Sequence, residues 1–184
     1  MIAPFCIIQA RSDSQRLPQK MGLTLQGKTL LTRAWEQASS IFGADNVVIA
    51  THYADLGIVP LIPSTAQHFI GIVPPDDVLG RFWQCVDRYN AFDRQIIRWT
   101  PDDWRKDSDM VRQAVGGDLT APVEASIEYF SGAELNRWHW KVISKRREHI
   151  GLLLPPRPVA PADALPWSID TQKDYNLVVA AVGA

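Results

Sequence analysis

The residues best suited to chemistry in this sequence are concentrated in one short polar segment near its N-terminus. Residues 10–20 read ARSDSQRLPQK and follow an apolar run that is rich in isoleucine. Arginine offers a planar fork of hydrogen-bond donors, lysine a point charge and serine a hydroxyl, so the segment suits the oxygens of a polyphosphate. A solvated polar loop is the alternative, because the segment lacks the GxxxxGK[ST] pattern of a Walker A loop. The side chains that could bind phosphate are Arg11, Ser12, Ser14, Arg16 and Lys20.

Carboxylates occur at two places where they could hold a metal ion. Asp102 follows the apolar run QIIRW at 95–99, and Asp170 precedes a segment of helical periodicity. Mg²⁺ prefers one or two protein carboxylates together with substrate phosphates, so Asp102 and Asp170 could hold one Mg²⁺ over a triphosphate. Each aspartate could instead cap a turn or a helix.

Other reactive residue types show no pattern that indicates a site. The histidines lack metal-ligand spacing, and the cysteines lie among apolar residues without a CxxC pattern, as reduced core side chains do. No Ser-His-Asp or Cys-His order stands out, and direct phosphoryl transfer requires no nucleophile from the protein. Trp138 and Trp140 could line a sugar or a dimer surface, although aromatic residues near a helix end are more often in the core. The histidines and cysteines are His52, His68, His139, His149, Cys6 and Cys85.

Alternating strand and helix patterns predict an α/β fold around a mainly parallel sheet. Apolar, β-branched runs predict strands at 2–10, 46–51 and 95–99. Helical spacing predicts one helix from 28 to 43, closed by a C-cap glycine, and a second from 76 to 89. Strand, helix and strand within about fifty residues form the βαβ unit of a parallel sheet. Open sheets of this kind bind ligands beyond the carboxyl ends of their strands, where the polar segment lies.

Less regular patterns predict the remaining elements. Thr171 with Asp174 three residues later approximates a capping box, so a last helix is expected to begin there. The other predicted elements are strands at 69–73 and 126–130 and helices at 108–115 and 132–140.

Length and charge restrict the class of protein. The chain has 184 residues and a formal net charge of −1, so we expect one domain over residues 1–184 without the basic excess of a nucleic-acid binder. The N-terminus has no basic start, and no segment approaches the roughly 18 apolar residues of a membrane span. We therefore expect a cytoplasmic protein that neither binds nucleic acid nor inserts into a membrane.

Several segments, taken in order, resemble the cytidylyltransferases of the SpsF-like, acylneuraminate and KDO (CMP-sugar synthetase) group. They read IIQARSDSQRLPQK, GKTLL, VVIAT, DDVLGRF, IIRWTPDD and WSIDTQKDYNLV. The resemblance implies a Rossmann-like nucleotidyltransferase (nucleotide-diphospho-sugar transferase) fold, with helices flanking a mainly parallel sheet. It also implies an enzyme that uses CTP and Mg²⁺ to make a CMP-sugar for glycan or surface-polysaccharide synthesis, with loss of pyrophosphate. Homodimers are common in this group.

The resemblance assigns roles to individual residues. It implies that Arg11, Lys20 and Asp102 are catalytic and that Asp102 and Asp170 bind the metal. Glu128 and the pair Glu148 and His149 would lie on the acceptor side. The backbone at Gln9 and Ala10, with the side chains of Asp77 and Arg81, would face the base. The implied nucleotide-binding set is Gln9, Ala10, Arg11, Ser14, Arg16, Lys20, Asp77 and Arg81.

Some positions depart from the family pattern. At one position where family members have glycine, this sequence has Asp13. The aspartate places a negative charge and a Cβ where a phosphate should approach closely. Ser126 stands in place of an aspartate on the acceptor side, and Asp103 and Trp104 replace the usual Cys-Pro after the metal-binding aspartate. The chain is also shorter than typical family members between residues 117 and 123. The alternatives are a non-catalytic descendant that binds a nucleotide or serves in assembly, and a nucleotidyltransferase that uses another nucleotide or acceptor.

Overall fold

The computed structural model of the chain describes residues 2–12, 14–106, 109, 111, 128–154 and 165–183, the side chains of Ser144 and Lys145 excepted. Most of the helix predicted at 108–115 lies outside these residues, as do Asp13, Ser126 and the shortened stretch from 117 to 123. In the described parts of the chain, no helix combines the length and the apolar character that crossing a bilayer requires.

A five-stranded, mainly parallel sheet forms the centre of the fold, which confirms the predicted fold class. The strands are ordered β5-β4-β1-β6-β7, and only the edge pair of β6 and β7 is antiparallel. Its inner strands are largely apolar, as expected where helices cover a sheet on both faces. The strands are β1 (Phe5–Gln9), β4 (Val47–His52), β5 (Gln67–Gly71), β6 (Gln95–Trp99) and β7 (Glu128–Ser131).

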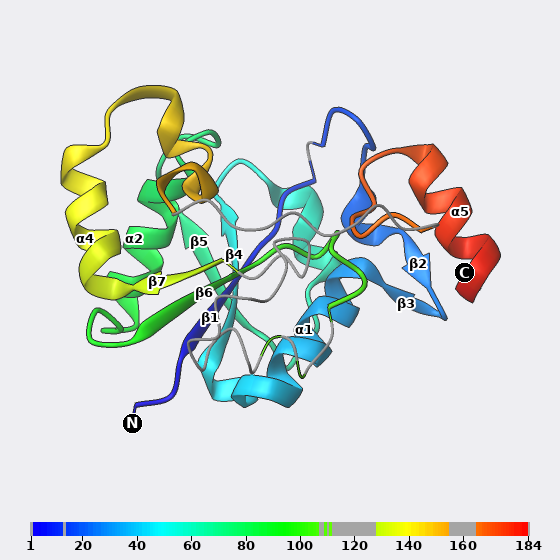
Figure 1. The fold of residues 1–184 in the computed structure, drawn as a ribbon, viewed down its shortest axis with the longest axis horizontal. Coiled ribbons are helices and arrows are strands. Elements are labelled where there is room, and N and C mark those ends of the chain that lie inside the picture. Colours follow the sequence, from blue (N-terminus) through cyan, green and yellow to red (C-terminus); the bar gives the residue numbers. More distant parts are fainter. Residues whose placement is uncertain are drawn as a thin grey trace.

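Helices pack on both faces of this sheet (Figure 1). Because side chains alternate along a strand, Cys6 and Ile8 of β1 pack on the side of α1 (Leu30–Phe42), whereas Phe5 and Ile7 pack on the opposite side. The opposite side is covered by α2 (Val78–Arg88) and α4 (Gly132–Lys141). The parallel strands β1 and β6 therefore end at one edge, with a helix layer on either side.

The C-terminal helix α5 (Gln172–Val182) packs beside the main sheet rather than on it. In Figure 1 it lies against the two-stranded hairpin of β2 (Thr24–Leu25) and β3 (Lys28–Thr29). A separate apolar cluster joins these parts, and it consists of Leu17, Leu25, Leu30, Ile169 and Val178. The capping box of Thr171 and Asp174 is present, as the sequence indicated. This packing brings Asp170 next to the polar segment that follows β1.

Most differences from the predicted elements concern their ends. The third strand spans 67–71 instead of 69–73, because the N–H of Ile72 already donates to the Gln84 side chain (3.0 Å). The segment after β4, which contains Pro60, forms only a short 3-10 helix. The 3-10 helices are η1 (Lys20–Gly22), η2 (Ala44–Asn46), η3 (Leu56–Leu61), η5 (Ser144–Arg147) and η6 (Ile150–Leu153).

We expect Gly132→Ala to destabilise the fold, although alanine is the better helix former. A Cβ at the first residue of α4 would lie 2.5 Å from the carbonyl oxygen of Phe92, which is backbone and cannot turn away. The expected loss is about 1–3 kcal/mol in the free energy of unfolding, measured by urea titration. Gly22→Ala is the matched control, because its Cβ would meet only the Leu61 side chain at 3.4 Å. Equal stability of the two variants would contradict the prediction.

Candidate functional site

A pocket of about 440 Å³ lies at the edge of the sheet where β1 and β6 end. It brings together the basic segment after β1, Asp102 after β6, and Asp170 before α5. Residues from widely separated parts of the chain therefore share one cavity, as expected at the carboxyl edge of a parallel sheet. The pocket is lined by Gln9, Arg11, Ser14, Gln15, Arg16, Lys20, Met21, Arg98, Thr100, Pro101, Asp102, Glu148 and Asp170.

A buried carboxylate holds the start of the basic segment in place. The backbone N–H of Ser12 donates to Asp55 Oδ2 (2.7 Å), and its hydroxyl donates to Asp55 Oδ1 (2.5 Å). Asp55 lies after β4 and is only 5% exposed. The backbone at Ser12 is thus anchored to the turn that follows β4. Sequence reasoning missed Asp55, because nothing in its local pattern separates it from an ordinary turn residue.

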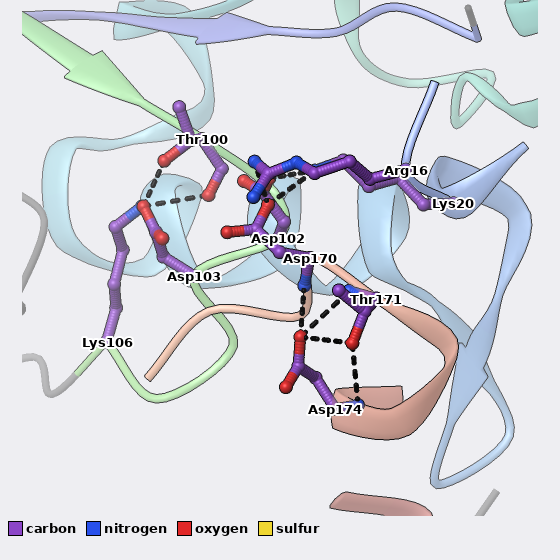
Figure 2. A network of polar contacts seen from close by, with 9 residues as sticks. All are labelled: Arg16, Lys20, Thr100, Asp102, Asp103, Lys106, Asp170, Thr171 and Asp174. Carbon is purple, nitrogen blue, oxygen red and sulfur yellow. Dashed lines mark hydrogen bonds and ion pairs between the residues drawn. The ribbon is translucent and has the colours of Figure 1, made fainter. Parts of the chain in front are cut away.

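Two cationic side chains are directed at the two carboxylates of the pocket. Lys20 Nζ forms an ion pair with Asp102 Oδ2 and lies 3.4 Å from Asp170 Oδ1. Arg16 Nη2 donates to the same Asp170 oxygen at 2.9 Å. Figure 2 shows Arg16 and Lys20 extending together toward the aspartates. Because one ammonium touches both carboxylates, Asp102 and Asp170 converge on a single point.

The segment from 165 to 170 is fastened to the turn that carries Asp102. The backbone N–H of Ile169 donates to the Asp102 carbonyl (2.9 Å), and the Trp104 indole donates to the Pro166 carbonyl (2.8 Å). The guanidinium of Arg105 lies 4.3 Å above the Trp167 ring. These contacts set the spacing between Asp102 and Asp170. Trp104, a departure from the family pattern, therefore has a structural partner here.

A buried ion pair lies beside Asp102 (Figure 2). The Lys106 ammonium donates to Asp103 Oδ2 (3.1 Å) and to the Thr100 carbonyl (2.9 Å), and the Thr100 hydroxyl also donates to Asp103. The ammonium lies 4.6 Å from the centre of the Trp99 ring. Burial lowers the pKa of Lys106, and the nearby Asp103 opposes that shift. Asp103 thus compensates the charge of Lys106 and holds the turn from Thr100 to Asp103.

Arg98 connects three strands on another wall of the pocket. Its Nε donates to Gln9 Oε1 (2.9 Å), and its Nη1 lies 2.8 Å from Glu128 Oε2. Glu148 also lines the pocket, whereas His149 is an exposed side chain 3.9 Å from Glu148 and does not line it. Sequence reasoning missed Arg98. The available signal was a charged residue inside an otherwise apolar strand.

Three residues expected at the nucleotide do not line this pocket. Asp77 caps α2 by accepting from the Gly80 N–H (2.8 Å), and it forms a bidentate pair with Arg147 (2.8 and 3.0 Å). Arg81 is fully buried, with its side chain against Gly71. Ala10 is also fully buried, and its N–H donates to the Ala50 carbonyl (3.2 Å).

The remaining candidates from the sequence occupy positions away from the pocket. Both cysteines are buried and unpaired, as expected, and burial raises the pKa of both thiols. Trp138 packs against the core, whereas Trp140 is 70% exposed on α4. His68 lies 2.8 Å from the Thr51 hydroxyl, and His139 stacks on Trp83.

Comparison with known proteins confirms the resemblance that the sequence motifs indicated. Residues 5–57 match the family model described as cytidylyltransferase. The 3-deoxy-manno-octulosonate cytidylyltransferase of Sodalis glossinidius is 34% identical over 93 residues, which are 50% of this chain and 36% of that protein. The chain thus spans only about a third of the length of this curated relative.

Solved structures of the same fold cover nearly the whole chain. A cytidylyltransferase from Leptospira borgpetersenii aligns with a TM-score of 0.77 and 23% identity, over 95% of this chain and 84% of that one. CMP:2-keto-3-deoxy-manno-octonic acid synthetase complexed with CTP aligns with a TM-score of 0.72 and 15% identity, over 98% of both chains. A manganese complex of Rv0371C from Mycobacterium tuberculosis H37Rv aligns with a TM-score of 0.67 and 14% identity, over 98% of this chain and 100% of that one.

We expect Lys106→Met to destabilise the protein by about 3 kcal/mol, because it leaves the Asp103 carboxylate buried without its partner. The double variant Asp103→Leu with Lys106→Met removes both charges and should recover most of that loss. Urea titration measures the free energy of unfolding.

The control for this prediction is Lys28→Met, which breaks an exposed ion pair with Glu36. Its expected cost is below about 1 kcal/mol. A double variant that is no more stable than Lys106→Met alone would refute a role for charge compensation.

Proposed function

We propose that this protein is a cytidylyltransferase that transfers a cytidylyl group from CTP to a hydroxyl of a sugar or sugar acid and releases pyrophosphate. The observation that carries the proposal is the pocket itself, which combines a basic loop with two carboxylates that converge on one point. Loop cations suit a triphosphate, and convergent carboxylates suit a divalent ion bound to it. The product would supply an activated sugar for glycan or surface-polysaccharide synthesis.

The basic segment is the proposed triphosphate site. Arg11, Ser14, Arg16 and Lys20 all line the pocket, so their donors can reach the phosphate oxygens from one side. Their positive charge would stabilise the negative charge that develops on the bridging oxygen as it leaves with pyrophosphate. The two hydrogen bonds between Ser12 and Asp55 would preorganise this side of the pocket for the nucleotide.

Asp102 and Asp170 are the proposed ligands of a Mg²⁺ ion. They fit a small cation because both already contact one ammonium group. Among the described residues no place gathers three or more acidic, histidine or cysteine ligands, so phosphate oxygens and water would complete the coordination. When bound, such an ion neutralises phosphate charge and orients the α-phosphate.

The acceptor would lie beside Arg98 and Glu148, on the wall of the pocket away from the basic segment. In the proposed reaction the acceptor hydroxyl oxygen forms a bond to the α-phosphorus, and the bond from that phosphorus to the bridging oxygen breaks. The hydroxyl proton passes to a base or to water, and Glu148 is the pocket carboxylate not engaged by Lys20 or Arg16 in the hydrogen bonds and ion pairs described above. Glu128, paired with Arg98, would set the orientation of that wall.

The first test is a calorimetric titration with CTP, GTP, UTP and ATP, each with Mg²⁺ and with EDTA. Selective, Mg²⁺-dependent binding of CTP is the expected result, followed by pyrophosphate release when sugar acids such as 3-deoxy-manno-octulosonate are added. Binding of no nucleotide would favour the non-catalytic alternative. If another nucleotide binds in preference to CTP, that nucleotide becomes the proposed donor substrate.

We expect Asp102→Ala to abolish Mg²⁺-dependent pyrophosphate release while the thermal unfolding transition stays cooperative, because the variant loses one of two proposed metal ligands. Asp45→Ala is the matched control, since Asp45 is exposed in η2, before β4, and does not line the pocket. Unchanged turnover in Asp102→Ala would remove this residue as a metal ligand.

We expect Lys20→Ala to weaken CTP binding far more than CMP binding, because the lost charge would face the β- and γ-phosphates. Calorimetry of both nucleotides measures the difference, with an expected loss of about tenfold or more for CTP. An equal loss for CTP and CMP would refute the triphosphate role of Lys20.

A further inference from the structure

Lys20 occupies the place between the two carboxylates where a cation would bind. Its ammonium contacts Asp102 Oδ2 directly and lies 3.4 Å from Asp170 Oδ1. The lysine side chain is only 11% exposed, and the Asp102 side chain 17%. The same lysine is therefore both a proposed phosphate ligand and the present counter-ion of the proposed metal ligands.

The charges of the four side chains around this point are balanced. Asp102 and Asp170 contribute two negative charges, and Lys20 and Arg16 contribute two positive ones at contact distance. A divalent ion that enters beside Lys20 would meet a positive charge at its binding position. Repulsion at such short distances is strong where water is partly excluded.

We propose that Lys20 is an exchangeable counter-ion that keeps divalent metal out of the site until a polyphosphate draws the lysine away. The inference rests on the proposed nucleotide and metal sites and adds a role for Lys20 in the order of binding. A lysine is suited to this exchange, because its charge is a point on a flexible four-carbon stem and needs only side-chain rotation to move.

Arg16 contributes to the same exchange from the outer side of the pocket. Its guanidinium pairs with Asp170, and its side chain is 68% exposed. An incoming polyphosphate would meet Arg16 first and then compete with both carboxylates for the two cations. Metal and polyphosphate thereby promote each other's binding, and thermodynamic linkage requires the effect to be reciprocal.

The test measures Mn²⁺ binding to the nucleotide-free protein, with free Mn²⁺ counted by electron paramagnetic resonance. Lys20→Met should bind Mn²⁺ at least about tenfold more tightly than the unchanged protein, because it removes the competing charge but keeps an unbranched side chain of similar reach. Lys20→Gln carries the same expectation and replaces Lys20→Met if that variant does not fold.

Matched controls separate charge from shape and locate the ion. Lys20→Arg keeps the positive charge and should bind Mn²⁺ no more tightly than the unchanged protein. Lys28→Met removes a lysine that pairs with Glu36 outside the pocket and should also have no effect. Adding Asp102→Asn to Lys20→Met should abolish the gain, since the ion would lose one of two carboxylates.

The inference is overturned if neutral variants at Lys20 bind Mn²⁺ no more tightly, if Lys20→Arg shows the same gain, or if the gain survives Asp102→Asn. Failure of the proposed function looks different. A gain in Mn²⁺ affinity without any nucleotide-dependent pyrophosphate release would retain the counter-ion role and refute the cytidylyltransferase activity.

Discussion

The site depends on one constraint: oppositely charged side chains must lie close together at the edge of a sheet, outside its apolar core. Parallel pairing of β1 and β6 places the ends of both strands at one edge, so the basic segment and Asp102 meet there. Asp102 and Asp170 each have a cationic partner there, so neither carboxylate is left without charge compensation in the absence of a ligand. The proposed site for a polyphosphate and a cation is assembled this way from side chains of both signs.

The second structural requirement is that Asp170 reaches this edge from the far end of the sequence. Neither β-strand pairing nor the core under α1 places it there. A hydrogen bond from Ile169 to Asp102 and the Trp104 and Arg105 contacts join the two segments, while the apolar cluster under α5 supports them. The position of one proposed metal ligand therefore depends on local contacts of the other.

Much of the fold could be predicted from the sequence, because apolar periodicity and caps are local signals. The pattern QIIRW matches β6, and Thr171 with Asp174 forms the predicted capping box. The pocket was predicted in outline, since strand ends of a parallel sheet share an edge. Side-chain contacts between distant parts of the chain could not be predicted, because they leave no local pattern. Examples are the pairs of Asp55 with Ser12, Arg98 with Glu128 and Asp77 with Arg147. Asp77 illustrates the ambiguity, since a helix cap and a ligand look alike in sequence.

The separate apolar cluster of α5 has a consequence for the order in which the molecule is completed during synthesis. Leu17, Leu25 and Leu30 are made early, whereas Ile169 and Val178, which cover them, are made much later. All five strands of the described sheet precede residue 132, whereas Ile169, Val178 and the second carboxylate of the pocket, Asp170, follow residue 164. A chain that has been made only as far as β7 therefore holds every strand of the described sheet but lacks the residues that cover these leucines and one of its two converging aspartates.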